Sequence, residues 1–268
     1  MKTLLINAKL LTFEPAPDFV AGELLFEDGI ILAIGEPNEL PRDGVTVIDA
    51  CGALVSPGLV DVHTHGRAGG DFTSADTALL QQMSRSYLEA GATTVMPTLA
   101  SAPYDEYGHA ADRIASVAKS PSGARYIGLH LEGRYLHPAK RGAHASELLA
   151  PLDAAELQAL NERMCRPYQQ AGLPCPMRLS AALELDKDGR FSAIANGLGI
   201  GLSLGHTTAT FDQATAAIEH GARLAGIDAH VGSLAPGRYA DLLLLDEYDG
   251  NVVVRAVYVG GIRREVTL

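Results

Sequence analysis

The chain has 268 residues, a net charge of −11 and 47% hydrophobic residues. This length and composition allow one large packed domain or two modest ones. The acidic charge argues against a nucleic-acid partner, which binds a basic surface. No stretch approaches the roughly 18 consecutive apolar residues of a membrane-spanning helix. These numbers therefore predict a globular protein that has neither nucleic acid nor a membrane as its partner.

Both ends of the chain are rich in predicted strands. Polar residues interrupt the opening stretch, MKTLLINAKLLTF, too early for the apolar core of a signal peptide, so this stretch predicts a first strand. Asp28-Gly29 lies between two apolar runs and predicts a hairpin turn. In the last 35 residues, breaks at Asp249-Gly250 and Gly260-Gly261 separate further predicted strands.

The cysteines give a prediction about the cellular compartment. Cys51, Cys165 and Cys175 are an odd number, are scattered along the chain and form no CxxC motif. Such a set is typical of reduced thiols rather than of a disulfide framework. We therefore expect three free thiols and a cytoplasmic protein.

The middle of the chain alternates between predicted strands and helices. Apolar strands are predicted over 59–63, 92–100, 125–133, 177–186 and 200–206, and helical patterns follow at 74–91, 104–120, 152–172, 191–199 and 210–222. For the first helix, Ser74 is the expected N-cap and Gly91 the expected stop. This βα alternation predicts a parallel sheet with helices on its faces. About five βα units lie between Leu59 and Ala222, whereas a (β/α)₈ barrel has eight.

Polar side chains gather where these predicted strands end. His63 and His65 end the first strand, Glu132 the third, Glu184 the fourth and His206 the fifth. Active sites of barrels are built at the carboxyl ends of the strands, and open α/β sheets follow the same rule at their switch point. No GxGxxG motif follows the first strand, which disfavours a dinucleotide-binding fold.

Three of these strand ends have the residue types of a metal site. His63 and His65 are two residues apart, so an extended strand directs both imidazoles to one face. Glu132 and His206 add a carboxylate and a third imidazole, and such a donor set can lower the pKa of bound water toward 7. Each of these residues alone has an ordinary structural explanation, but their shared position favours a metal site. We expect His130 to support the ligands from behind, His109 and His220 to be surface residues, and His230 to be structural.

A basic loop, EGRYLHPAKRGAH, follows the third strand in this otherwise acidic chain. Five basic or titratable groups within eleven residues predict a contact with an anionic substrate such as a phosphate; they are Arg134, His137, Lys140, Arg141 and His144. The alternative is a solvated basic loop. Gly142-Ala143 before His144 indicates that the backbone comes close to a ligand there.

Several longer stretches resemble the N-acetylglucosamine-6-phosphate deacetylase family of the amidohydrolase superfamily. They are SPGLVDVHTHGRAGGDF, GATTVMPTL, GLHLEGRYLHPAKRGAH, LSLGHTTAT and GSLAPGRYADLLLLD, in the family's order. HLEG followed by KRGAH is specific within the superfamily, whereas HTHG marks only the superfamily. The resemblance covers most of the chain.

The resemblance implies a fold and a reaction. The fold is a (β/α)₈ TIM barrel over 57–233, incomplete here, with a small β-sandwich made from 1–56 and 234–268. The reaction is attack of a metal-activated water on the acetamide of a phosphorylated amino sugar, which gives glucosamine-6-phosphate and acetate. The resemblance also implies a homodimer.

The resemblance assigns roles to residues of this chain. His63, His65, Glu132 and His206 match metal ligands, and His144 matches a histidine that contacts the sugar and polarises the carbonyl. Ala143, Arg134, Lys140 and Arg141 complete the expected substrate-binding set. The donor set suits one or two divalent ions, with Zn²⁺ first and Fe, Co or Mn as alternatives.

The chain departs from the family in two places. Arg134 stands where the family usually has Pro. After Ala222, the family continues through further strands with another metal-binding histidine and the aspartate that acts as general base and acid, and none of this is present. Either residues are missing from the sequence as it stands, or the chain has a true internal deletion. We favour the first, because an open five-eighths barrel exposes apolar strand edges.

Two alternative functions stay open. One is another amidohydrolase that acts on a cyclic amide or an amine. Such enzymes usually place a carboxylated lysine on a barrel strand, whereas here the strand-end acid is Glu132. The other is a catalytically inactive remnant that binds a metal or a sugar phosphate, which a true deletion would favour.

Overall fold

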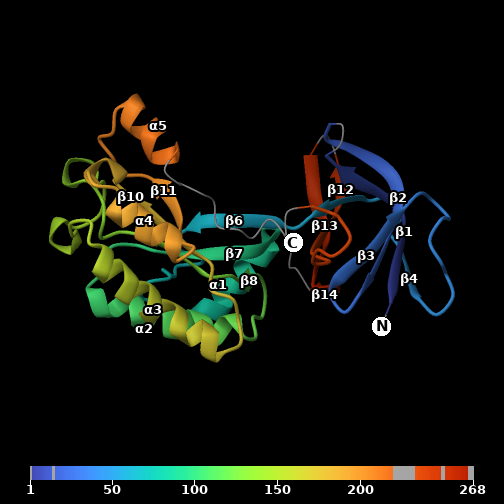
Figure 1. Ribbon diagram of the computed structural model, residues 1–268. Helices are drawn as coiled ribbons and strands as arrows, with labels where there is room; N and C mark the ends of the chain where they lie inside the picture. Colours follow the sequence, from blue (N-terminus) through green and yellow to red (C-terminus); the bar gives the residue numbers. More distant parts are fainter. Residues whose placement is uncertain (1, 14–15, 220–232, 249–250, 265–268) are drawn as a thin grey trace. The chain divides into compact units, whose positions relative to one another are not determined.

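The computed structural model describes residues 2–13, 16–219, 233–248 and 251–264 (Figure 1). The expectations for His220, His230, the turn at Asp249-Gly250 and the junction after Ala222 lie outside these residues. The chain divides into two compact units. The first comprises Met1–Val60, Arg85–Thr94 and Ile227–Leu268, and the second comprises Asp61–Ser84 and Val95–Gly226.

The first unit contains a largely antiparallel sheet. Its strands are β1 (Thr3–Thr12), β2 (Asp18–Glu27), β3 (Ile30–Gly35), β4 (Thr46–Asp49), β5 (Leu54–Pro57), β12 (Leu242–Tyr248), β13 (Asn251–Val259) and β14 (Ile262–Arg264). They are hydrogen-bonded in the order β14-β13-β12-β5-β1-β2-β3, and β4 also pairs with β1. The predicted strands at the two ends of the chain thus belong to one sheet. The hairpin turn predicted at Asp28-Gly29 is confirmed, with φ of 48° and 84° at its two residues.

One apolar core joins the strands from the two ends of the chain. Buried side chains of the N-terminal strands pack with those of β12 and β13; they include Leu5, Leu10, Leu24, Phe26, Ile31, Val55, Leu242, Leu244 and Tyr258. Each end of the chain therefore depends on the other for burial of its apolar face. The two-layer sandwich stays a prediction.

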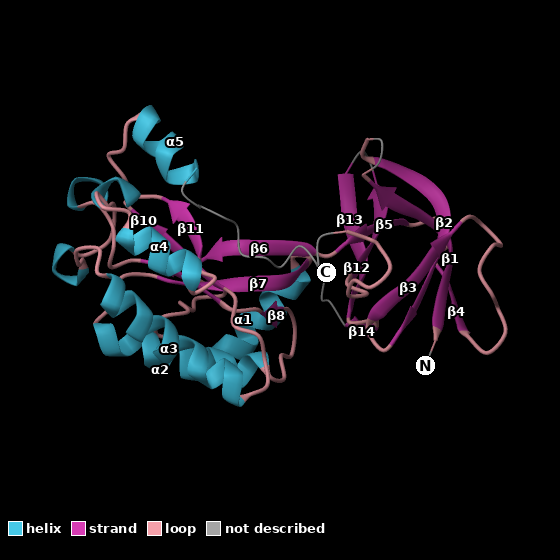
Figure 2. Cartoon of the chain, in the orientation of Figure 1, coloured by secondary structure: helices cyan, strands magenta, loops and turns pink. Residues whose placement is uncertain are grey.

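The second unit is an α/β structure around a parallel half-barrel sheet (Figure 2). Its strands are β6 (Leu59–Thr64), β7 (Ala92–Leu99), β8 (Arg125–Tyr126), β9 (Leu129–Glu132), β10 (Met177–Ala181) and β11 (Gly201–Leu204), in the order β11-β10-β9-β7-β6 with β8 beside β7. The pairs β7–β9, β9–β10 and β10–β11 are parallel. The predicted alternation of strands and helices in a parallel sheet is confirmed.

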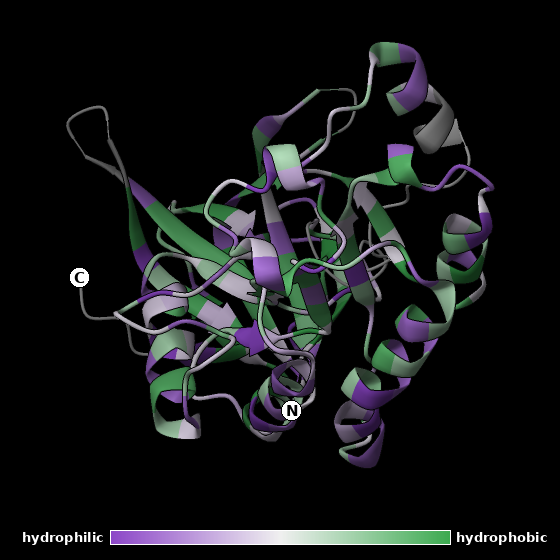
Figure 3. Ribbon diagram, turned by 90° about the vertical axis from the view of Figure 1, so that its left-hand side faces the viewer, coloured by the Kyte–Doolittle hydropathy of each residue, from purple (hydrophilic) through white to green (hydrophobic). Residues whose placement is uncertain are grey.

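Helices follow the strands of this sheet. They are α1 (Thr77–Glu89), α2 (Tyr104–Ala118), α3 (Ala154–Gln170), α4 (Arg190–Gly197) and α5 (Phe211–Glu219), with single 3₁₀ turns at Pro138–Lys140, Ser146–Leu148 and Leu183–Leu185. Helix ribbons alternate between hydrophobic and hydrophilic residues, as expected when one face is buried (Figure 3). Among the described helices, none has both the length and the hydropathy that a membrane crossing requires.

One strand is shorter than predicted. β10 ends at Ala181, and Glu184 lies in the following 3₁₀ turn rather than in the strand. Its carboxylate accepts hydrogen bonds from the Thr207 hydroxyl, at 2.5 Å, and from the Thr208 backbone N–H, at 2.7 Å. Glu184 therefore holds the turn that follows β11, and this contact between loops is not encoded by strand periodicity.

The ends of α1 show one prediction confirmed and one wrong. Gly91 adopts a φ of 84° and its N–H bonds the Leu88 carbonyl, so it ends the helix as expected. The N-cap is Asp76 rather than Ser74, because the Asp76 carboxylate accepts the Leu79 N–H at 2.8 Å. A carboxylate at this end also interacts favourably with the helix dipole.

Replacing the cap tests this assignment. Asp76→Ala should lower the free energy of unfolding by about 1 kcal/mol, because the N–H of Leu79 loses its partner. Ser74→Ala is the matched control and should change it by less than about 0.5 kcal/mol. Denaturant unfolding followed by circular dichroism measures both. Equal losses in the two variants would contradict Asp76 as the cap.

Candidate metal centre

The structure brings the predicted ligands together at the carboxyl ends of the parallel strands. His63 is the next-to-last residue of β6, His65 follows that strand, Glu132 ends β9 and His206 follows β11. One donor atom from each of His63, His65 and Glu132 lies within 4.8 Å of the others, and the same holds for Glu132, His144 and His206. Glu132 is shared by both groups. All these residues belong to the second unit.

The Glu132 carboxylate is the centre of this cluster. Its Oε2 lies 2.7 Å from His65 Nε2 and 3.2 Å from His63 Nε2. Its Oε1 lies 3.2 Å from His206 Nε2. Two ligands of one tetrahedral zinc ion are about 3.3 Å apart, given metal–ligand bonds of about 2.0 Å. Within the group of His63, His65 and Glu132, these separations fit the ligands of a divalent ion, and His206 meets the other oxygen of the same carboxylate.

A backbone hydrogen bond determines which ring nitrogen of His206 can bind a metal. His206 Nδ1 lies 2.9 Å from the backbone carbonyl of Lys140. A carbonyl oxygen only accepts, so Nδ1 carries the hydrogen and the neutral ring has its lone pair on Nε2. That lone pair faces a carboxylate oxygen of Glu132, and two lone pairs this close need a proton or a cation between them. Backbone bonds of this kind commonly orient histidine ligands of metals.

The electrostatics of the cluster favour a negative carboxylate. The hydrogen bond from His65 outweighs burial and lowers the pKa of Glu132 to about 2. The same bond raises the pKa of His65. Without an ion, a proton on an imidazole balances the Glu132 charge; a divalent ion can take the place of that proton.

His130, expected to support the ligands, lies fully buried behind them. Its Nδ1–H points to the Val62 carbonyl at 3.2 Å, and its Nε2 lies 2.9 Å from the Ser180 hydroxyl. Its ring meets the His63 ring edge-on, with centroids 4.7 Å apart. Burial lowers the pKa of His130 to about 4, so the ring is neutral near pH 7. Because both nitrogens have protein partners, His130 packs against the His63 ring rather than providing a ligand.

Ser101 is a residue of this cluster that the sequence analysis missed. Its hydroxyl lies 2.8 Å and its backbone nitrogen 3.4 Å from His144 Nδ1. A backbone N–H only donates, so His144 Nδ1 accepts and the hydrogen of the neutral ring is on Nε2. Ser101 follows β7 by two residues, so the criterion of polar residues after strand ends would have found it.

Known proteins with similar sequences are named as deacetylases of N-acetylated amino-sugar phosphates. The chain is 32% identical over 206 residues to N-acetylgalactosamine-6-phosphate deacetylase from Escherichia coli O157:H7, covering 75% of this chain and 50% of that protein. It is 30% identical over 228 residues to human N-acetylglucosamine-6-phosphate deacetylase, covering 81% and 54%. This chain is homologous to the N-acetylglucosamine-6-phosphate deacetylases. It spans about half the length of the curated relatives it matches.

A solved structure agrees with this relationship. The N-acetyl-D-glucosamine-6-phosphate deacetylase from Mycobacterium smegmatis aligns with a TM-score of 0.64 and 27% identity, over 82% of this chain and 54% of that one. No protein-family model matches the chain. The amidohydrolase superfamily is consistent with the α/β half-barrel of the second unit.

Arg134, which stands where the deacetylase family usually has Pro, has a structural role here. The Arg134 guanidinium binds both carboxylate oxygens of Glu156 on α3, at 2.7 and 2.6 Å, and lies over the Tyr104 ring. Its backbone has a φ of 54°, which proline cannot adopt. Arg134 therefore fastens its loop to α3, and its charge is already paired.

The rest of the basic loop divides into bracing and exposed residues. Arg141 donates to the His144 carbonyl at 2.6 Å and so holds the backbone beside that histidine. His137 accepts the Ala139 N–H and caps the following 3₁₀ turn. Lys140 and Ala143 are exposed. Of the three loop cations, Lys140 is therefore the one best placed to meet an anion.

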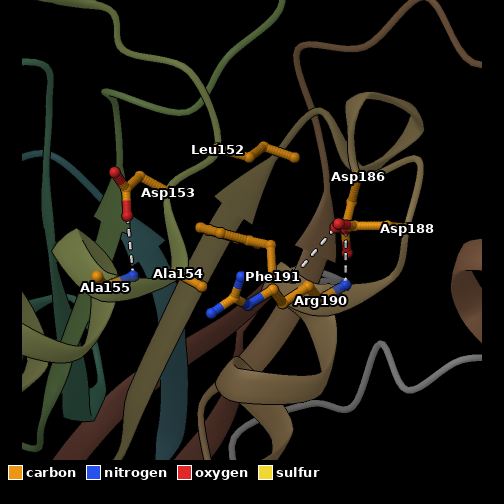
Figure 4. A pocket seen from close by; sticks show the side chains of 8 residues that line it. All are labelled: Leu152, Asp153, Ala154, Ala155, Asp186, Asp188, Arg190 and Phe191. Atoms are coloured by element: carbon orange, nitrogen blue, oxygen red, sulfur yellow. Dashed lines mark hydrogen bonds between the residues drawn. The ribbon is translucent and has the colours of Figure 1, made fainter.

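A separate cavity of about 340 Å³ lies between the starts of α3 and α4 (Figure 4). Its three carboxylates each accept a backbone N–H: Asp153 from Ala155, Asp186 from Phe191 and Asp188 from Arg190. They organise the starts of the two helices. None of the candidate ligands lines this cavity.

His130 makes the stability of the metal-free protein depend on pH. Its pKa is about 4 when folded and 6.5 when unperturbed, so the unfolded chain binds more protons between these values. The free energy of unfolding should therefore fall by about 3 kcal/mol as the pH drops from 6.5 to 4. The lowered pKa of Glu132 acts below about pH 4.5, at the acidic edge of this window, and the raised pKa of His65 acts above it.

Denaturant unfolding in a chelator at several pH values measures this slope. His130→Asn should flatten it, whereas the control His109→Asn, on the exposed face of α2, should leave it unchanged. A slope that survives in His130→Asn would show that another group is responsible.

Proposed function

We propose that this chain acts in the metal-dependent hydrolysis of the N-acetyl group of N-acetylglucosamine-6-phosphate, which gives glucosamine-6-phosphate and acetate. The observation that carries this proposal is the convergence of three imidazoles on the Glu132 carboxylate at the carboxyl ends of parallel strands. The names of the homologous proteins support the reaction and the phosphorylated amino-sugar substrate.

Each residue has a proposed part in this reaction. His63, His65, Glu132 and His206 would hold the ion. A divalent ion held there would polarise a carbonyl and lower the pKa of water. His144 directs the N–H of its Nε2 to the carbonyl oxygen of the acetamide, because Ser101 occupies its Nδ1. Lys140 provides positive charge for the phosphate, and the exposed backbone at Ala143 lies beside the sugar.

The ion is the least specified part of this proposal. Histidine and carboxylate donors suit Zn²⁺ first, and Fe, Co or Mn as alternatives. Glu132 contacts His63 and His65 through one carboxylate oxygen and His206 through the other, which is compatible with one ion or with two. Metal analysis of the purified protein distinguishes these cases.

The wider architecture belongs to the same proposal. Residues 57–233 form the barrel part of a (β/α)₈ hydrolase, and 1–56 with 234–268 form its small sandwich. The resemblance also implies a homodimer, and the cysteine usage favours the cytoplasm. A cyclic-amide hydrolase is not favoured, because the named homologues are deacetylases of amino-sugar phosphates.

Acetate release depends on the strands that the resemblance places after Ala222, because in the family they carry the general base. The described residues supply no match to the aspartate that acts as general base in the resemblance, and the junction falls outside them. If residues are missing from the sequence, the natural protein should release acetate. If the deletion is true, the chain should bind the ion and the sugar phosphate without releasing acetate.

Acetate release from purified protein tests the proposed function. N-acetylglucosamine-6-phosphate and N-acetylgalactosamine-6-phosphate are the two substrates, and intact mass establishes which chain was assayed. A chelator should abolish release, and adding Zn²⁺ should restore it. Glu132→Gln should lower both bound metal and rate at least about 100-fold, since it removes the shared ligand. The exposed Glu147→Gln is the control. A protein that binds neither metal nor sugar phosphate overturns the proposal.

Ser101 gives a test that does not depend on turnover alone. Ser101→Ala should remove the closer partner of His144 Nδ1 and leave only the backbone N–H at 3.4 Å, which lets the second tautomer form and lowers kcat about 10-fold with little change in KM. Ser101→Thr should restore the rate, and Ser146→Ala on the neighbouring loop should have no effect. ¹⁵N NMR of the His144 ring reports the tautomer directly. An unchanged tautomer in Ser101→Ala would contradict the positioning role.

A further inference from the structure

Two of the three cysteines lie against each other, away from the candidate metal centre. The Sγ atoms of Cys165 and Cys175 are 2.6 Å apart, although ten residues separate them in the sequence. Cys165 is buried in α3, and Cys175 is partly exposed in the segment before β10. The expectation of three free thiols is confirmed. The contact between two of them was not predicted, because sequence spacing does not show where a turn returns the chain.

The local structure holds this pair together. Gly172 has a φ of 72°, and the Leu173 N–H bonds the Tyr168 carbonyl at 2.9 Å, which turns the chain back along the end of α3. Pro174 and Pro176 flank Cys175 and restrict its backbone. The Cys165 thiol also lies 3.5 Å from the Cys175 carbonyl. The two sulfurs therefore approach each other without a large rearrangement.

We propose that Cys165 and Cys175 are an oxidation site at which a hydroperoxide converts two thiols into an intramolecular disulfide. One thiol of the pair loses its proton, and its thiolate attacks one oxygen of hydrogen peroxide. The O–O bond breaks, and the hydroxide leaves with the thiol proton as water. The other thiol then attacks the sulfenic sulfur, the S–O bond breaks, and the second water leaves with the proton of that thiol. The sum is two thiols and one peroxide to one disulfide and two waters.

The position of the pair indicates what the disulfide does. The Pro176 carbonyl accepts the Leu129 N–H at 3.0 Å, and the Tyr168 hydroxyl bonds the Gly128 carbonyl at 2.9 Å. These contacts lie where β9 and β10 begin, whereas Glu132 lies where β9 ends. A disulfide here joins the last turns of α3 to the start of β10. It therefore stabilises the second unit and leaves the ligands in place.

The sequence allows a direct assay of this site. Trypsin cleaves after Arg163 and Arg178 but not at Arg166, which precedes Pro167, so one peptide, 164–178, contains both cysteines. Hydrogen peroxide should remove two hydrogens from this peptide, and dithiothreitol should restore them, whereas methionine sulfoxide resists that thiol. Oxidation should also raise the midpoint of thermal unfolding by roughly 5 °C, because the bond restricts the unfolded chain.

Three variants make the result specific. Cys51→Ser keeps the pair and should respond like the unchanged chain, whereas Cys165→Ser and Cys175→Ser should show neither effect. Bound metal should stay the same after oxidation, so this result is independent of the proposed function. The proposal is overturned if peptide 164–178 keeps both thiols while Cys51 is oxidised. It is equally overturned if oxidation stops at a sulfenic or sulfinic acid, or if the link forms between chains.

Discussion

The candidate centre depends on one buried carboxylate that is shared by three imidazoles. Glu132 is the last residue of β9, and the histidines reach it from the ends of β6 and β11. This meeting requires strands that run in the same direction, because only then do their carboxyl ends share one edge. The hydrogen bond from His65 holds the pKa of this carboxylate near 2, so Glu132 stays negative at neutral pH. A negative carboxylate among imidazoles thus lies at the edge where ligands bind in α/β proteins.

Buried polar groups behind the cluster keep its ligands in place. The Thr98 hydroxyl accepts the Thr64 N–H at 2.9 Å, which fixes the backbone between His63 and His65. His130 bridges the Val62 carbonyl and the Ser180 hydroxyl across the sheet. Each of these buried groups has a hydrogen-bond partner. They therefore restrict the positions of the strands without the loss of stability that an unpaired buried polar group causes. The strands therefore carry both the ligands and the bonds that orient them.

Periodicity and strand ends predicted the part of the centre that lies on the strands. His63, His65 and Glu132 follow from the two-residue repeat and from the shared direction of parallel strands. His206 was predicted in the same way, from the end of the fifth strand. The bonds that orient the loop residues could not be predicted so, because they depend on loop conformation. His206 and Arg134 both have positive φ values, and such conformations are uncommon for residues other than glycine. The bond between the Lys140 carbonyl and His206 and the bond from Arg134 to Glu156 depend on those conformations. The turn that brings Cys175 back to α3 likewise depends on the positive φ of Gly172.

The basic loop illustrates why composition overstates the charge available to a substrate. The Glu156 carboxylate pairs with the Arg134 guanidinium, and the Arg141 guanidinium donates its hydrogen bond to the loop backbone at His144. The backbone of Lys140 orients His206 while its side chain remains exposed. A loop that appears in the sequence as a phosphate-binding patch is thus mainly a brace between α3 and the ends of β9 and β11. In a chain with a net charge of −11, the proposed attraction of a sugar phosphate would then rest on Lys140 and on the divalent ion that Glu132 and the three histidines would hold.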